Sequence, residues 1–179
     1  AAEDGATAEA RGGDSWVPAP ALAAAIDALP TEAAKKVELG WLSKLSSEQF
    51  RVLRMKGTEE IHTGEYNEYF EEGSYACAAC AKPLYASEHK FKSGHGWPAF
   101  FDNYPGALTR IEHGKNARKK IEITCSGCGA HVGHVFFSKR YPKPTHERHC
   151  VNSISLAFAP PGGFFIAAED NVEARGELD

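Results

Sequence analysis

The chain has 179 residues, of which 42% are hydrophobic and 25% charged, a composition expected of one globular domain with a core and an extension. Its formal net charge of −4 argues against nucleic acid as a partner, because phosphate binding needs a basic surface. The sequence has no apolar run of about 18 residues or more, so it predicts no membrane span.

The N-terminal segment of residues 1–18 contains Gly, Ala and acidic residues without hydrophobic periodicity, which predicts disorder. It resembles neither a secretory signal nor an Arg-rich, acid-poor transit peptide. The chain begins without Met, as would a trimmed chain or a mature form whose targeting segment has been removed. We therefore expect the cytoplasm or, after such removal, an organelle such as a plastid or mitochondrion.

The next segment is expected to form a helical N-terminal arm. An Ala-rich stretch over residues 19–29 predicts a first helix, and Thr31 occupies the N-cap position of a second. In that second helix Val37, Trp41 and Leu45 recur every four residues on one face. We interpret the arm as a structural element that packs against the main domain.

A main domain begins near residue 46. Ser46 and Gln49 have the spacing of a capping box before the helical run F-R-V-L-R, which Gly57 would end. Short β-prone runs separated by turn residues follow from about residue 73: S-Y-A-C, I-E-I-T-C, H-V-F-F and V-N-S-I-S-L-A-F. Residues 121–124 and 151–158 also alternate as half-buried strands do. These patterns predict a mainly β fold of antiparallel strands.

Two charged segments lie among and after the predicted strands. The basic stretch 115–120 is interpreted as a solvated loop or strand edge, with anion binding as the alternative. The C-terminal segment is acidic and is interpreted as a tail, in which Phe164, Phe165 and Ile166 fold back on the domain or, as the alternative, dock on a partner. The predicted units are a disordered N-terminus, a helical extension, a main domain and a tail, over residues 1–18, 19–45, 46–160 and 161–179.

Four of the five cysteines form two C-x-x-C pairs, which are Cys77, Cys80, Cys125 and Cys128. Two such knuckles set face to face would present four thiolates in the tetrahedron that structural Zn²⁺ requires. The alternatives are two disulfides, a redox C-x-x-C pair, bound iron and a mixed site that uses His131. A redox pair normally opens the helix of a βαβ unit, which this sequence does not predict. The pattern indicates a reducing compartment.

The fifth cysteine, Cys150, has no obvious partner. In a strand, Arg148 and Asn152 would point to the same side as Cys150, and a guanidinium near the sulfur would favour the reactive thiolate. Burial of such a polar stripe for packing alone would be unfavourable. An inert, packed cysteine is the alternative. In S-G-H-G-W-P-A-F (93–100), Trp97 either forms the wall of a small apolar pocket or belongs to the core.

In chain order, these motifs resemble those of the methionine-R-sulfoxide reductase B family. They are G-T-E (57–59), T-G-E-Y (63–66), C-A-A-C (77–80), S-G-H-G-W-P-A-F (93–100), C-S-G-C-G-A-H-V-G-H-V-F (125–136), P-K-P-T (142–145) and R-H-C-V-N-S (148–153). The resemblance covers roughly residues 46–158. It implies two antiparallel sheets in a β-tent arrangement, stapled by a structural four-cysteine zinc site. It also implies an oxidoreductase that repairs proteins containing methionine-R-sulfoxide after oxidative stress.

The resemblance implies a role for each residue that matches the family's motifs. Cys150 matches the catalytic cysteine that attacks the sulfoxide sulfur and becomes a sulfenic acid. Trp97 matches the indole that holds the substrate's methyl group, and His131 and His134 match the pair that binds and polarises the sulfoxide oxygen. Groups that orient the substrate and support the thiolate are matched by Arg148 and Asn152, and the zinc ligands by the four paired cysteines.

The chain departs from the family's pattern in two places. Many members carry a resolving cysteine near the G-W-P motif, where this chain has His95. We therefore expect a one-cysteine enzyme whose Cys150 sulfenic acid is reduced by an external thiol, either thioredoxin or glutaredoxin with glutathione. His149 replaces the usual aromatic residue before the catalytic cysteine and would point to the opposite face of its strand. The alternative function is a zinc-stapled β module that acts as a binding or accessory subunit of a larger assembly, docked through its terminal extensions.

Overall fold

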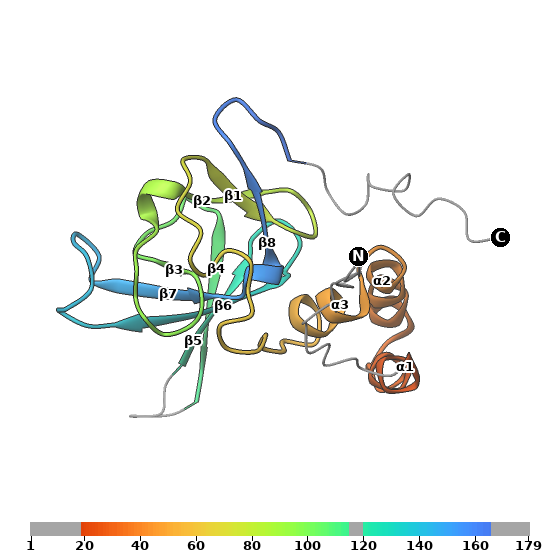
Figure 1. Cartoon of the computed structure of the whole chain (residues 1–179). Coiled ribbons are helices and arrows are strands. Elements are labelled where there is room, and N and C mark those ends of the chain that lie inside the picture. The colour runs from red at the N-terminus through yellow and green to blue at the C-terminus, as the bar shows by residue number, and fades with distance from the viewer. Residues whose placement is uncertain (1–18, 115–119, 166–179) are drawn as a thin grey trace, which may run out of the picture.

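The computed structural model describes residues 19–114 and 120–165 (Figure 1). Two antiparallel β-sheets form the body of the protein, and three helices form an arm at one side of it (Figure 1). Within the described ranges, no helix has both the length and the apolar character needed to span a membrane.

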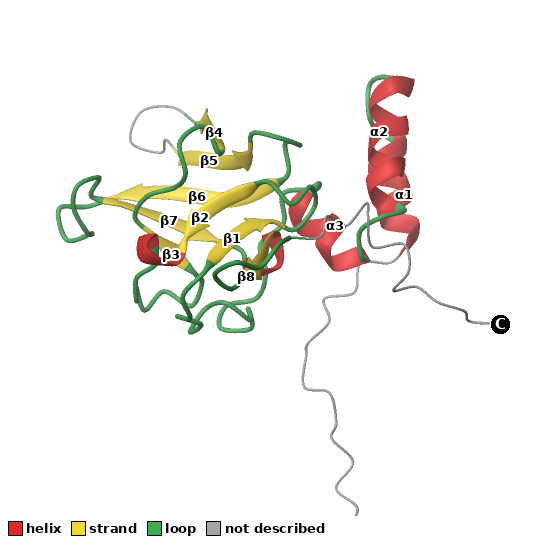
Figure 2. Cartoon of the chain, turned by 90° about the horizontal axis from the view of Figure 1, so that it is seen from above, coloured by secondary structure: helices red, strands yellow, loops and turns green. Residues whose placement is uncertain are grey.

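The arm consists of α1 (Ala19–Asp27), α2 (Glu32–Leu42) and α3 (Ser47–Leu53). Both predicted helix starts are confirmed. Thr31 caps α2 by accepting the backbone N–H of Ala34 at 3.1 Å, and Ser46 and Gln49 form the capping box of α3. Figure 2 shows α3 beside the sheets and the other two helices farther out.

The predicted apolar stripe of the second helix is confirmed only in part, because Trp41 is partly buried and packs against the core whereas Val37 does not. α2 buries none of its residues, and Val37 is 55% exposed. The helix ends at Leu42, so Leu45 lies beyond it, buried in the core. α3 instead buries three side chains, those of Phe50, Val52 and Leu53. It also ends at Leu53, earlier than the glycine that was expected to stop it.

The strands form one sheet of three and one of five, so the prediction of a mainly β fold with two antiparallel sheets is confirmed. The smaller sheet has the order β2-β1-β8, and the larger has the order β3-β7-β6-β5-β4. The bounds are β1 Ser74–Cys77, β2 Pro83–Ala86, β3 Ala99–Phe100, β4 Leu108–His113, β5 Lys120–Cys125, β6 His131–Phe137, β7 Glu147–Val151 and β8 Leu156–Ala159.

The core lies between the two sheets. Alternate residues of the five-stranded sheet, such as Ile123, Val135 and Val151, are buried there as the period of a half-buried strand requires. Phe100 stacks on Tyr85 of the smaller sheet with ring centroids 4.1 Å apart. The opposite face of the five-stranded sheet is therefore the one left to carry polar chemistry.

The alternation over residues 151–158 predicted one strand, and this prediction is wrong. β7 ends at Val151, the 3₁₀ turn η3 (Ser153–Ser155) follows, and β8 then joins the other sheet. The Glu59 carboxylate explains the break, because it accepts the backbone N–H groups of Ser153 at 2.7 Å and Ile154 at 3.1 Å. These donors are thus satisfied outside a ladder, and the chain can cross between sheets.

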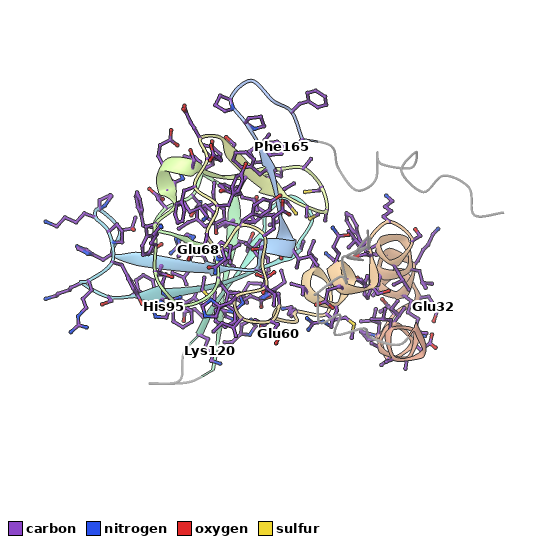
Figure 3. All side chains as sticks on the ribbon, in the orientation of Figure 1. Glu32, Glu60, Glu68, His95, Lys120 and Phe165 are labelled. Carbon is purple, nitrogen blue, oxygen red and sulfur yellow. The ribbon has the colours of Figure 1, made fainter. Side chains whose placement is uncertain are left out.

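After β8 the chain extends from the smaller sheet as a loop at the top of Figure 1. Phe164 is 82% exposed, so the predicted folding back of this residue is wrong, whereas Phe165 is half-buried (Figure 3). Ile166 and the predictions for residues 1–18, 115–119 and 166–179 lie outside the described residues.

Candidate active site and thiol cluster

The four paired cysteines meet at the ends of β1 and β5. Their sulfur atoms all lie within 4.8 Å of one another. The Cys77 and Cys128 sulfurs are 3.7 Å apart, and those of Cys80 and Cys125 are 3.6 Å apart. In a tetrahedral site with Zn–S bonds of about 2.3 Å, neighbouring sulfurs lie about 3.8 Å apart. The spacing fits a tetrahedral metal and is far too long for S–S bonds.

The two knuckles have matching backbone geometry. The N–H of Ala81 donates to the Cys77 carbonyl at 2.8 Å, and the N–H of Gly129 donates to the Cys125 carbonyl at 2.8 Å. Ala81 and Gly129 also share the left-handed conformation, with φ of 60° and 73°. Hydrogen bonds among the four sulfur atoms lower the pKa of the Cys125 thiol and raise the pKa of the Cys77 thiol. The residues present therefore fit Zn²⁺.

A pocket of about 180 Å³ opens on the outer face of the five-stranded sheet, opposite the core. Side chains from β6, β7, the loop before β3 and the segment after α3 surround it. Its lining residues are Thr58, Trp97, Gly133, His134, Phe136, Cys150, Val151 and Asn152. All eight lie within the sequence motifs given above, and four of them had been assigned a role there: Trp97, His134, Cys150 and Asn152.

Strand register brings Cys150 and His134 together. Cys150 of β7 pairs with His134 of β6 on one side and with Ala99 of β3 on the other, so these side chains share one face. Gly133 permits this approach, because a Cβ at that position would lie 1.9 Å from the Cys150 carbonyl oxygen. Burial raises the pKa of the Cys150 thiol, and the neighbouring Arg148 guanidinium opposes that rise.

Arg148 is held in a defined position beside Cys150. Its Nε donates to the Tyr141 hydroxyl at 3.1 Å, and its guanidinium carbon lies 4.5 Å from the centre of the Phe136 ring. Phe136 lines the pocket and is 43% exposed. The guanidinium charge is thus fixed next to the thiol by aromatic stacking, as well as by strand geometry.

The side chains of Trp97 and Asn152 are both tied to the backbone of Glu59. Trp97 Nε1 donates to the Glu59 carbonyl at 3.2 Å, and Asn152 Oδ1 accepts the Glu59 N–H at 3.0 Å. Asn152 Nδ2 also donates to the Val132 carbonyl at 3.2 Å. Asn152 lies just past the end of β7, so the expected stripe of three residues on one strand is wrong, although Asn152 still lines the pocket.

The histidine pair of β6 lies behind and beside the thiol. The rings of His131 and His134 meet edge to face with centroids 5.4 Å apart. Burial lowers the pKa of both imidazoles. Only His134 lines the pocket, whereas His131 is 2% exposed and directs Nδ1 to the Glu122 carboxylate at 2.9 Å. The same geometry takes His131 away from the thiol cluster, so the mixed Cys/His metal site is wrong.

The sequence model of the SelR domain matches residues 45–160. The chain belongs to the SelR domain family. It is similar to peptide methionine sulfoxide reductase B2, chloroplastic, of Arabidopsis thaliana, with 58% identity over 129 residues, or 72% of this chain and 63% of that protein.

Two proteins from rice are also similar in sequence to this SelR domain. Peptide methionine sulfoxide reductase B3, chloroplastic, of Oryza sativa subsp. japonica is 56% identical over 126 residues, which are 70% of this chain and 54% of that protein. Peptide methionine sulfoxide reductase B5 from the same source is 54% identical over 120 residues, which are 67% of this chain and 87% of that protein. The chain thus spans less than two thirds of the length of the two chloroplastic relatives.

Sequence reasoning on this SelR domain missed two carboxylates, Glu59 and Glu122. Both are buried, at 7% and 2% exposure, and both accept several hydrogen bonds near the pocket. The only available signal for Glu122 was a charged residue inside the apolar alternation of a predicted strand. Glu59 lies in the G-T-E motif (57–59), but the motif alone gave this carboxylate no role.

The connecting segment (residues 54–59), between α3 and the loop before β1, contacts each part of the site. Arg54 Nη2 also forms an ion pair with Oε1 of Glu38 in α2, at a distance of 2.7 Å. The contacts toward the site are Arg54 Nη1 to the Cys128 carbonyl at 3.0 Å, Lys56 Nζ to Glu122 at 2.9 Å, Thr58 to the pocket, and the Glu59 N–H to Asn152 at 3.0 Å.

The two histidines that depart from the family pattern occupy different surroundings. His95 lies in an exposed loop, where its Nδ1 contacts the Ser93 carbonyl at 2.9 Å (Figure 3). His149 faces the core, as expected for a residue next to Cys150 in a strand. Its Nδ1 contacts the Tyr85 hydroxyl at 3.1 Å, and its Nε2 contacts Glu147 at 2.8 Å.

Proposed function

We propose that this SelR domain reduces methionine-R-sulfoxide in proteins to methionine, with Cys150 as the nucleophile. The observation that carries the proposal is the pocket in which Cys150 and His134 face each other across paired strands, next to Trp97. The names of the relatives, all peptide methionine sulfoxide reductases, support the same reaction. The pocket's small volume suits a side chain with a methyl group and a polar sulfoxide.

In the proposed first half-reaction, the Cys150 sulfur attacks the sulfoxide sulfur. The S–O bond breaks, oxygen passes to Cys150, and the products are methionine and a Cys150 sulfenic acid. The substrate sulfur gains two electrons and the cysteine sulfur loses two. The thiol proton moves to the transferred oxygen, so no other reactant is needed in this half.

The burial of the site suggests how that proton moves. Because burial raises the pKa of Cys150, its thiol is protonated at neutral pH, and because burial lowers the pKa of His134, its imidazole is neutral and able to accept the proton. His134 then donates it to the sulfoxide oxygen. The Arg148 charge favours the transient thiolate. Trp97 forms the pocket wall that contacts the methyl group, and Asn152 orients the substrate at the pocket lining.

The second half-reaction requires thiols from outside the chain. Cys150 is the fifth of five cysteines and the other four form the cluster, so no resolving cysteine remains. One external thiol condenses with the sulfenic acid to form a mixed disulfide and water, and a second thiol then releases Cys150 and an external disulfide. Thioredoxin, or glutaredoxin with glutathione, supplies thiols of this class.

We also propose that the four clustered cysteines hold structural Zn²⁺ and that the protein works in a plastid. A zinc ion bound by four thiolates has no open position for water, so it would supply folding energy at the ends of β1 and β5 and no reaction step. The plastid assignment is supported by two relatives that are named chloroplastic. Detection of the protein in purified plastids tests it.

Single-turnover reduction tests the activity. The zinc-loaded protein is mixed with a peptide that contains methionine-R-sulfoxide, in the absence of any reductant, next to Cys150→Ser. We expect one methionine per protein and one oxygen atom added to Cys150, with neither in the variant. A folded, zinc-loaded protein that forms no methionine would favour the accessory-module function over the enzyme.

A further inference from the structure

A buried carboxylate lies behind the histidine pair. Glu122 of β5 is 2% exposed, yet it belongs to the outer face of the sheet, where it pairs in register with His134. His134 pairs in turn with Cys150, so Glu122, His134 and Cys150 form a row across three neighbouring strands. The row connects this carboxylate to the thiol through one histidine in the sheet ladder.

Three side chains from different parts of the chain donate to Glu122. His131 Nδ1 of β6 contacts Oε1 at 2.9 Å. Lys56 Nζ of the connecting segment contacts Oε2 at 2.9 Å, and His113 Nε2 of β4 contacts the same oxygen at 2.6 Å. Burial of a carboxylate is unfavourable unless it is well paired, and an apolar residue would fill this position without that cost. The arrangement therefore calls for a reason other than packing.

Building on the proposed reductase function, we propose that Glu122 is a positioning residue that fixes the tautomer and orientation of His131 against His134, and that stabilises positive charge on this histidine pair during proton transfer. The bond from Nδ1–H to Glu122 leaves Nε2 as the other, proton-accepting nitrogen of His131. The ring is held by that bond on one side and by the edge-to-face contact with His134 on the other.

The Glu122 side chain carries its negative charge throughout the neutral pH range in which the reaction would run. Burial opposes ionisation of Glu122, but hydrogen bonds from Lys56, His131 and His113 outweigh it and lower its pKa to about 2. Burial also lowers the pKa of His131, whereas the bond to Glu122 raises it and the charge of Lys56 lowers it. Besides these groups, Lys120 acts on His134. The carboxylate and the ammonium thus act on His131 with opposite signs.

The opposite signs give a test with two variants. Glu122→Gln removes the negative charge and should lower the pKa of His131, and Lys56→Met removes a positive charge and should raise it. The Lys56 side chain is 53% exposed, and two histidines still bond to Glu122 after its replacement, so Lys56→Met should disturb the fold less than Glu122→Gln. Histidine ring NMR titration of the zinc-loaded protein measures both shifts without any need for turnover.

The same variants are then compared in single-turnover kinetics. Because His134 must be neutral to accept the thiol proton, the rate falls at low pH. This acidic limb should move to lower pH in Glu122→Gln, because the Glu122 charge raises the pKa of His134. The maximal rate of Glu122→Gln should fall by at least about tenfold, with its KM within about twofold of the parent.

The outcomes separate this inference from the proposed function. A His131 titration that is unmoved in Lys56→Met and in folded Glu122→Gln overturns the positioning role. So does a Glu122→Gln rate that falls with no movement of the acidic limb, because a loss of packing alone would have that effect. Shifted titrations in a parent protein without reductase activity would refute the proposed function and leave the Glu122–His131 coupling established.

Discussion

Replacement of Gly133 by Ala should separate β6 from β7 at the row that holds His134 and Cys150. An added Cβ would lie 1.9 Å from the Cys150 carbonyl oxygen, which falls about 1.1 Å short of the 3.0 Å that such atoms keep in proteins. The obstacle is backbone in the middle of a ladder, so no side-chain rotation relieves it. The two strands must therefore move apart locally.

The size of the effect follows from this displacement. Overpacking costs about 1–3 kcal/mol, and each ladder hydrogen bond that is stretched costs roughly 1 kcal/mol more. We expect Gly133→Ala to lower the free energy of unfolding by about 2–4 kcal/mol. A misplacement of reacting groups by about 1 Å can slow a reaction about 100-fold, so the first-turnover rate should fall by about that factor.

Urea unfolding and single-turnover methionine formation measure the two quantities. Gly40→Ala is the matched control, because Gly40 lies in α2 and an added Cβ would have nothing within 4 Å. That variant should keep the parent's rate and gain about 0.5–1 kcal/mol of stability, since Ala is the better helix former. Equal stability and rate in the two variants would refute the reasoning from the close strand contact.

Three further predictions concern the metal, pH and the pocket wall. Zinc removal by a chelator, or Cys125→Ser, should unfold the domain, which circular dichroism would detect; a folded, slow, metal-free protein would contradict a structural site. Glu122, whose pKa is lowered to about 2, stabilises the fold above its usual value of 4.5 and loses this contribution as the pH falls toward 2. Glu122→Gln should therefore cost up to about 3 kcal/mol at pH 7 and little near pH 2 in urea unfolding. Trp97→Phe loses the bond to Glu59 and should lower kcat/KM about tenfold, mainly through KM; an unchanged KM would exclude Trp97 from substrate binding.

The elements set by local chemistry were predictable from the sequence. Thr31, Ser46 and Gln49 act within one helical turn, so their caps depend on nothing distant. The two C-x-x-C pairs predicted their own convergence, because a four-thiolate site needs both. Arg148 and Cys150 were expected on one side of a strand, and the period of a strand places them there.

The elements set by distant partners were not predictable. The end of β7 depends on Glu59, which is 94 positions from Ser153 along the chain, so alternation alone predicted a strand that runs too far. The stripe of α2 had helical spacing, but only Trp41 of that helix face packs against the core, and Val37 remains exposed. Glu122 looks like any solvent-facing residue of an alternating strand until His131 and Lys56 are seen to surround it.

The pocket around Cys150 can form only after the ribosome has made two segments that lie far apart in the chain. The connecting segment is made before the strands, and its Glu59 must wait for Asn152, Ser153 and Ile154, which lie 93, 94 and 95 positions later in the chain. Closing so long a loop is entropically unfavourable until the intervening strands are paired. Trp97 and the Cys150 strand are therefore joined only in the finished domain, and an incomplete nascent chain carries this cysteine without the pocket around it.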